Sequence, residues 1–234
     1  MIETRDLVHR YGDHVALDGV SLSVPDGEFL LVAGPNGSGK TTLVRHWNGL
    51  LEPDAGDVLV NGRRVGADLV AARTTVGMVF QHPRDGFVAA TVGEDVAFGP
   101  ENLGLSRDEI DRRVDEALAA VGLSGREADR ITTLSGGEEE RLAIAGALAM
   151  EPDHLVLDEP LTGLDEPARR SVLARLRELH RSGTSVIVVT HDLRDLWDGA
   201  DRLVVLGDGR IVREAPPEGV LSDLPGLSVR DPRC

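Results

Sequence analysis

The chain has 234 residues, of which 40 are acidic and 25 are basic, and a formal net charge of −15 at pH 7. This length fits one large α/β domain or two small ones, and the acidic excess argues against nucleic-acid binding and adsorption to anionic lipid, since both need a basic surface. No apolar run approaches the roughly 20 residues that span a membrane, and residues 1–6 lack the features of a signal peptide, so we expect any membrane role to depend on a partner.

The residue usage also bears on the compartment. Cys234 is the only cysteine, so no internal disulfide is expected and a reducing compartment is favoured. The acidic excess suits a cytoplasm of high salt, where ions screen the repulsion between carboxylates. A GC-rich genome would explain arginine in place of lysine but not the excess of acid, so we prefer the high-salt interpretation.

The chain begins with a region of predicted strands, residues 2–32, which contains a turn at Pro25–Gly27. Tyr11, the only tyrosine, lies near its start. An aromatic ring there can stack on an adenine base, although a lone tyrosine in a strand region is more often a packing residue.

A phosphate-binding pattern follows. The apolar run Phe29–Ala33 predicts a buried strand and residues 43–51 predict a helix. Between them lies G-x-x-x-x-G-K-[ST], which directs backbone N–H groups and a helix N-terminus at one phosphate site. Lys40, the only lysine, is expected to reach the outer phosphates and Thr41 to bind Mg²⁺; the alternative is a glycine-rich turn without a ligand. The expected phosphate-binding residues are Gly34, Pro35, Asn36, Gly37, Ser38, Gly39, Lys40, Thr41 and Thr42.

The middle of the chain changes from strands to helices. Residues 57–62 and 75–80 predict strands, and the second ends at Gln81. Capping-box patterns at Thr91 and Ser106 predict the starts of two helices, the first over residues 92–98. This helical stretch interrupts the strands, so we expect a subdomain.

Three small residues, Ser135, Gly136 and Gly137, precede a helix predicted over residues 139–150. The N–H groups at such a helix end form a second anion site. The alternative is an ordinary serine N-cap.

Polar side chains directly follow the later predicted strands. The strand 154–158 ends in Asp158 and is followed by Glu159, and the strand 185–190 is followed by His191. Ligands bind at the carboxyl ends of strands in doubly wound sheets, so we expect these side chains near Gln81, with Asp158 on the metal side and Glu159 polarising a water. A histidine at a strand end is more often a polar terminus than a catalyst. A helix over 167–181 and a hairpin of 202–207 with 210–214 complete the predicted elements.

Together these motifs resemble the ATPase subunit of ABC transporters over roughly residues 2–225. The resemblance implies an α/β fold: a P-loop NTPase core with a mixed central sheet, an N-terminal antiparallel β subdomain and an inserted helical subdomain that carries the signature motif. It implies a single domain over 1–234. Its parts would be a core of 1–80 and 152–214, a helical subdomain at about 81–150 and a tail of 215–234.

The same resemblance assigns the roles. Tyr11 would stack on adenine, and Gly34 to Thr42 would bind the phosphates. Glu159 would be the catalytic base, with His191 and Lys40 as further catalytic residues, and Mg²⁺ would be bound by Thr41, Gln81 and Asp158. Two subunits would face head to tail, so that each ATP lies between one P-loop and Ser135-Gly136-Gly137 of the other.

Phe80–Pro83 and residues 91–105 more closely resemble the energy-coupling-factor group, whose members take up cobalt, nickel, biotin and other vitamins. In this sequence Gly86 stands where that group often has glutamine, Glu138 replaces a glutamine, and Glu139-Glu140 replace a usually basic or amide pair. We therefore expect the three glutamates at the dimer face.

The resemblance also implies cofactors and partners. These are ATP and Mg²⁺, a second identical or different ATPase subunit, and an integral membrane subunit that holds this chain at the cytoplasmic face of the membrane. The loop 81–90, with exposed Phe87 and Val88, and the next helix would form the groove for a helix of the membrane subunit; the alternative is an ordinary surface loop, since scattered exposed apolar residues need no partner. The alternative is a soluble ABC-type ATPase that acts as a clamp or assembly factor, for example in iron–sulfur cluster assembly.

Overall fold

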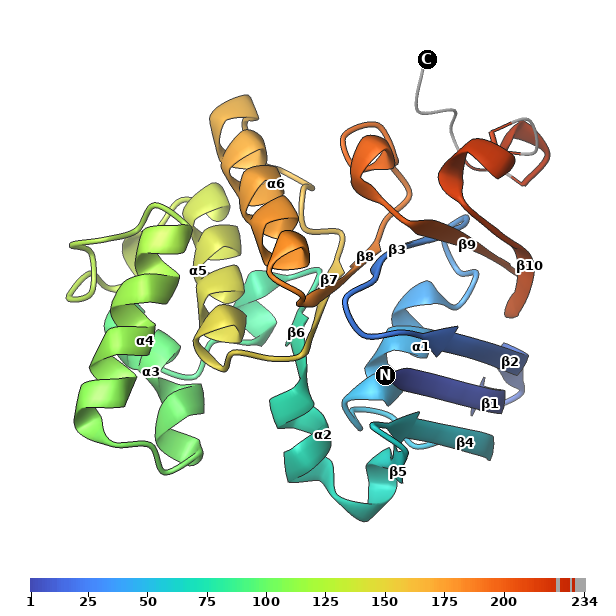
Figure 1. The fold of residues 1–234 in the computed structure, drawn as a ribbon, viewed down its shortest axis with the longest axis horizontal. Coiled ribbons are helices and arrows are strands. Elements are labelled where there is room, and N and C mark those ends of the chain that lie inside the picture. Colours follow the sequence, from blue (N-terminus) through green and yellow to red (C-terminus); the bar gives the residue numbers. More distant parts are fainter. Residues whose placement is uncertain (222–223, 228, 230–234) are drawn as a thin grey trace.

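The computed structural model describes residues 1–221, 224–227 and 229, and arranges their strands in two sheets (Figure 1). The first sheet is antiparallel, with the order β2-β1-β4-β5. The second has the order β10-β9-β3-β8-β7-β6 and is parallel except at the edge pair β9–β10. The strands are β1 (Ile2–Tyr11), β2 (His14–Val24), β3 (Phe29–Ala33), β4 (Ala55–Val60), β5 (Arg63–Arg64), β6 (Val76–Val79), β7 (His154–Asp158), β8 (Ser185–Val189), β9 (Arg202–Gly207) and β10 (Arg210–Ala215).

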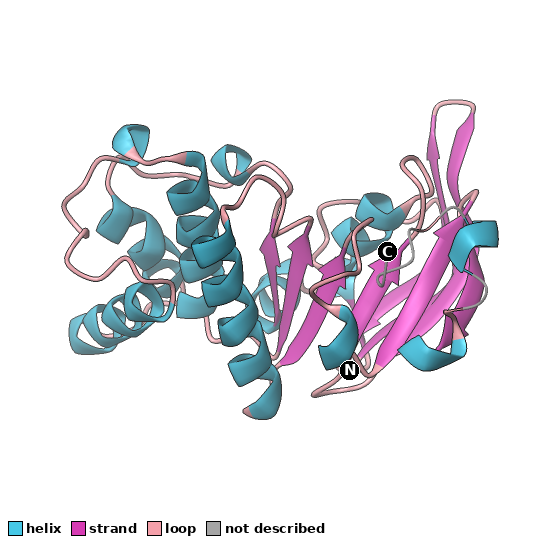
Figure 2. Ribbon diagram, turned by 90° about the horizontal axis from the view of Figure 1, so that it is seen from above, coloured by secondary structure: helices cyan, strands magenta, loops and turns pink. Residues whose placement is uncertain are grey.

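Helices gather at the end of the molecule opposite the antiparallel sheet (Figure 2). Three of them, α3, α4 and α5, pack against one another. The α-helices are α1 (Lys40–Trp47), α2 (Leu69–Thr75), α3 (Val92–Asn102), α4 (Arg107–Ala120), α5 (Gly136–Ala149) and α6 (Glu166–Arg181). Short 3₁₀ helices are η1 (Val65–Ala67), η2 (Pro83–Asp85), η3 (Ile131–Thr133), η4 (Trp197–Gly199), η5 (Pro217–Gly219) and η6 (Leu224–Leu227).

The central strands β3, β7 and β8 are buried along their whole length. Parallel strands covered on both faces are continuous apolar runs, and the alternating side chains point to opposite faces. In β3, Phe29 and Leu31 pack into the core that includes α5 and α6, whereas Leu30 and Val32 pack toward α1 and the antiparallel sheet. The central sheet thus lies between two cores, and its loops at the carboxyl ends of the strands stay free for a site.

The observed architecture confirms the predicted fold class: a mixed central sheet, an antiparallel N-terminal sheet and an inserted helical segment. The proposed limits of core, helical subdomain and tail stay a prediction. Cys234 lies outside the described residues. Among the residues that are described, no helix is long and apolar enough to cross a membrane.

Several helix limits differ from the prediction. Helix α1 begins at Lys40 rather than residue 43, because Gly39 is its left-handed N-cap, and it ends at Trp47 rather than residue 51. Helix α3 runs four residues beyond the predicted end at 98 and through Pro100, which costs one backbone hydrogen bond. Helix α2 lies in a stretch for which the sequence pattern predicts no helix.

Candidate nucleotide site

Two glycines fix the course of the P-loop between β3 and α1. Gly34 has φ 143° and Gly39 has φ 99°, in the left-handed half of conformational space that side chains avoid. A Cβ at Gly34 would lie 2.2 Å from the carbonyl oxygen of Leu206, and one at Gly39 would lie 2.6 Å from that of Ala16. Only glycine therefore lets the loop pass this close to β9 and β2.

Lys40 folds back over this loop. Its Nζ donates hydrogen bonds to the carbonyl oxygens of Gly34 at 2.8 Å and Pro35 at 3.0 Å, and the residue is buried. Burial lowers the pKa of Lys40, and the carboxylates of Glu159 and Asp158 act in the opposite direction. The Lys40 ammonium could give up its hydrogen bonds to the carbonyl oxygens of Gly34 and Pro35 and form hydrogen bonds to phosphate oxygens instead.

Thr41 and Asp158, two of the expected metal ligands, are in direct contact. The Thr41 hydroxyl donates to Oδ2 of Asp158 at 2.7 Å, and Asp158 is 2% exposed. Burial, with the neighbouring Glu159 carboxylate, raises the pKa of Asp158, and the bond from Thr41 partly offsets this. A cation bound here would favour the ionised form. The described residues hold no group of three or more His, Cys, Asp and Glu that could bind a metal by themselves.

Glu159 adopts a left-handed backbone conformation, with φ 55°. Its Oε1 accepts the backbone N–H of His191 at 3.0 Å and lies 2.6 Å from Nδ1 of the same residue. Its Oε2 accepts the Thr190 hydroxyl at 3.1 Å. The end of β7 and the end of β8 therefore hold the expected base, Glu159, and the expected catalytic histidine, His191, together.

A cavity of about 420 Å³ lies at the carboxyl ends of β3, β6 and β7. The cavity extends from the P-loop to the antiparallel sheet. Tyr11 and His14, which pair across the β1–β2 hairpin, line it on that side. Its lining residues are Tyr11, His14, Ala16, Asn36, Gly37, Gly39, Lys40, Thr41, Thr42, Gln81, Asp158 and Glu159.

Not every predicted residue lines this cavity. His191 lines an adjoining one of about 240 Å³, which shares Glu159 with it and also includes Thr190. Gly34 and Pro35 contribute carbonyl oxygens to Lys40, and Ser38 is buried. Ser135, Gly136 and Gly137 line neither cavity.

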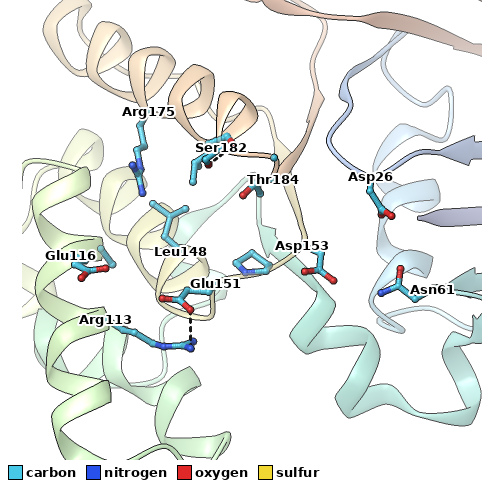
Figure 3. Close-up of a pocket in the computed structure, with 14 residues that line it drawn as sticks. Asp26, Asn61, Arg113, Glu116, Leu148, Glu151, Asp153, Arg175, Ser182 and Thr184 are labelled. Carbon is cyan, nitrogen blue, oxygen red and sulfur yellow. Dashed lines mark hydrogen bonds and ion pairs between the residues drawn. The ribbon is translucent and has the colours of Figure 1, made fainter.

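A larger cavity, of about 550 Å³, lies at the opposite, amino ends of the strands (Figure 3). Among its charged side chains, Arg113 binds Glu151, which also lines the cavity, and Arg175 binds Glu178, which does not. It contains none of the predicted site residues, so size does not identify the site here. The smaller cavity holds the lysine, the threonine hydroxyls and the two carboxylates.

Helix α5 begins at Gly136, three residues before the predicted start, and Ser135 is its N-cap. Ser135 and Glu138 form a reciprocal capping box, which together with Arg126 lowers the pKa of Glu138 to about 2. Ser135 therefore has the ordinary N-cap role, and its role in an anion site stays a prediction.

The expectation that Glu138, Glu139 and Glu140 all lie at an exposed dimer face is wrong for the last two, which are buried. Successive residues of an α-helix lie about 100° apart around its axis, so the three glutamates point in different directions. Glu139 and Glu140 point toward the interior of the chain. Glu139 binds Arg84, and Oε1 of Glu140 has no hydrogen-bond partner among the described residues.

The loop after Gln81 differs from expectation at one residue. Val88 is 58% exposed as expected, but Phe87 is half-buried against the helical core. Both line a groove of about 250 Å³, together with Phe98 of α3 and Met150 after α5. The loop and α3 therefore line a groove in which Val88 is exposed and Phe87 is packed, and its role as the receptor of a membrane-subunit helix stays a prediction.

The model of the ABC transporter family matches residues 17–162, from β2 to beyond β7. The chain belongs to the ABC transporter family. It is an ABC ATPase and binds ATP.

Three similar proteins extend the match to almost the whole chain. An ABC transporter ATP-binding protein of Halobacterium salinarum is 68% identical over 232 residues, which are 99% of this chain and all of that protein. The energy-coupling factor transporter ATP-binding protein EcfA of Methanocaldococcus jannaschii is 46% identical, over 96% of this chain and 82% of that protein. The structure of CbiO1 from Clostridium perfringens, described as part of the ABC transporter complex CbiONQ, is 33% identical with a TM-score of 0.84, over 99% of this chain and 96% of that one.

Some residues of this ABC ATPase that reach the site were missed. His14 and Ala16 line the cavity and Thr190 binds Glu159, but none belongs to a motif. The position of Thr190 directly after a buried strand could have suggested it. His14 could have been found only from the hairpin register that places it opposite Tyr11.

Proposed function

We propose that this ABC ATPase energises the uptake of a small solute, a cobalt or nickel ion, biotin or another vitamin, through an integral membrane transporter subunit. The observation that carries the proposal is the 46% identity with an energy-coupling factor subunit over 96% of the chain. ATP binding would close a dimer of ATPase subunits, and hydrolysis would open it again.

We assign the cavity to Mg·ATP. Tyr11 would stack on the adenine base, and the P-loop from Gly34 to Thr42 would bind the phosphates. The donor set fits Mg²⁺, which is usually bound by one or two carboxylates, hydroxyls and phosphate oxygens. Thr41 and Asp158 offer such oxygens in contact with each other, and Gln81 lines the same cavity.

Glu159 would orient and deprotonate the attacking water, with His191 beside it and Lys40 on the phosphates. Support comes from the 2.6 Å contact between Glu159 and His191 and from the place of both at strand ends. Phosphoryl transfer is catalysed mainly by positioning and charge, which these three side chains provide.

The second subunit would complete each site. Ser135, Gly136 and Gly137 lie at a helix N-terminus but do not line the cavity of their own chain. In a head-to-tail dimer this helix end would meet the phosphates bound by the other P-loop. The membrane subunit would place a helix in the groove beside Val88, so that this chain is held at the cytoplasmic face of the membrane.

The exposed rim of the groove provides the test. The double substitution Val88→Asp with Phe98→Asp changes two side chains that are 58% and 47% exposed, which leaves the half-buried Phe87 in place. We expect ATP binding to stay within twofold of wild type, while co-purification with the membrane subunit and solute uptake fall about tenfold or more, as for loss of an apolar anchor.

Val70→Asp is the matched control, since Val70 is 71% exposed on α2 and does not line the groove. Loss of ATP binding with retained partner binding would refute the assignment of the groove. Wild-type protein that never associates with a membrane subunit would favour the alternative of a soluble assembly factor.

A further inference from the structure

Arg84 and Glu139 join two segments that serve different nucleotides in the proposed dimer. Arg84 lies in η2, three residues after Gln81, and Glu139 lies in the first turn of α5, four residues after Ser135. Gln81 lines the cavity of its own chain, whereas Ser135 faces the site of the other subunit if the proposed dimer is correct.

The contact has the geometry of a strong ion pair. Nε of Arg84 lies 3.0 Å from both carboxylate oxygens of Glu139, and the NH2 group lies 2.6 Å from Oε1. A guanidinium that engages both oxygens fixes orientation as well as distance. The two side chains therefore hold the loop and the helix in one relative position.

Burial makes the pair unequal and hard to open. The Glu139 side chain is 8% exposed, whereas the Arg84 side chain is 73% exposed. If the loop moved away, the Glu139 carboxylate would stay buried without its partner, which is costly. A movement of the loop is therefore passed to the start of α5 more easily than it is absorbed by breaking the pair.

We propose that Arg84 is a positioning residue that transmits the state of the nucleotide cavity to the signature segment of the same chain. Binding of Mg·ATP at Gln81 moves the loop, the pair with Glu139 carries α5 along, and Ser135–Gly137 are presented to the second subunit. The functional role of this coupling rests on the proposed dimer, because Ser135–Gly137 would contact the nucleotide of the second subunit. The coupling itself acts within one chain.

The test measures amide hydrogen exchange in the full chain at a concentration where it is monomeric. A non-hydrolysable ATP analogue with Mg²⁺ is added, and exchange is followed in residues 81–90 and 135–142. In wild type we expect about fivefold slower exchange in both segments, at the low end of common coupling effects. In Arg84→Gln we expect the response of the loop to persist and that of the signature segment to disappear.

Two further variants make the result specific. The double substitution Arg84→Glu with Glu139→Arg should restore the response of the signature segment, since it rebuilds the pair with reversed charges. Arg107→Gln, which removes an exposed pair with Asp111 on α4, should leave both responses unchanged. A signature response that survives in Arg84→Gln, is absent from wild type, or is lost equally in Arg107→Gln would overturn the proposal.

Since the readout needs only nucleotide binding by a single chain, it is independent of transport. Failure of the proposed function would appear as loss of membrane association in the groove variants. Failure of the present proposal would appear as an unchanged exchange pattern in Arg84→Gln.

Discussion

Two adjacent glutamates on α5 are buried in different ways. Glu139 meets the guanidinium of Arg84, so its charge is compensated. Glu140 is 5% exposed, its Oε1 has no hydrogen-bond partner among the described residues, and burial raises its pKa to about 8. A carboxyl group in such surroundings is held mainly in its neutral form at pH 7.

Glu140 should therefore make stability fall as the pH rises. Between its ordinary pKa of 4.5 and about 8, the folded chain keeps a proton that the unfolded chain has lost. The free energy of unfolding should fall by up to about 1.4 kcal/mol per pH unit in this window and level off above it. Urea unfolding at pH 6, 7 and 8 measures the slope.

Glu140→Gln should flatten this slope and stabilise the chain at pH 8. Glu101→Gln, at an exposed position on α3, is the control and should keep the wild-type slope. An equal slope in Glu140→Gln and wild type would show that Glu140 is not the group that binds the proton.

At the residue scale, the sequence motifs predicted most residues that line the candidate nucleotide site. Lys40, Thr41 and Asp158 all line the expected cavity, because the parallel strands β3 and β7 end at the same edge of the central sheet. Burial of Glu139 and Glu140 could not be predicted, since it depends on which face of α5 packs inward. In the sequence the three glutamates form one charged run, but in the helix Glu138 is partly exposed while Glu139 and Glu140 are buried.

At the scale of elements, capping patterns were the most reliable guide. Thr91 and Ser135 form capping boxes with the glutamate three residues on, and Ser106 caps α4. Helix α2 was missed because its seven residues are too few for an apolar period, and Asp68 alone marks its start. Helix starts that depend on local hydrogen bonds can thus be predicted from the sequence, whereas a short helix that depends on tertiary packing cannot.

Ser106 and Ser135 provide a matched pair of N-caps. Each caps a helix of 14 residues and accepts the N–H of the residue three positions on at 3.4 Å. Ser106→Ala and Ser135→Ala should each cost about 1 kcal/mol of unfolding free energy. Only Ser135→Ala should also weaken ATP-driven dimer formation, since only that helix end is assigned to the second site.

Sedimentation with Mg·ATP and urea unfolding separate these two effects. A dimer defect of equal size in both variants would mean that stability alone is responsible. A Ser135→Ala protein that dimerises like wild type would remove Ser135 from the phosphate site.

At the scale of the whole molecule, charge and ion pairs act in opposite directions. The formal net charge of −15 favours expansion at low salt through repulsion between carboxylates. Exposed arginine–carboxylate pairs, such as Arg112 with Glu109 and Glu116, favour the folded state and are also screened by salt. Exposed pairs are worth about 0–1 kcal/mol each, so the uncompensated acidic excess should decide the direction.

We therefore predict that the chain gains stability with KCl. The Debye length falls from about 10 Å at 0.1 M to about 3 Å at 1 M, which removes most repulsion between neighbouring surface carboxylates. For a chain of this length a gain of about 2 kcal/mol raises the Tm by about 4–8 °C.

A variant with fewer charges separates repulsion from other salt effects. Glu101→Gln, Asp108→Asn and Asp115→Asn together neutralise three exposed carboxylates on α3 and α4. This variant should melt higher than wild type in 0.1 M KCl and gain less from 1 M KCl, because less repulsion is left to screen. If wild-type Tm instead fell steadily from 0.1 to 1 M KCl, the ion pairs would outweigh the repulsion and the high-salt interpretation of the composition would be wrong.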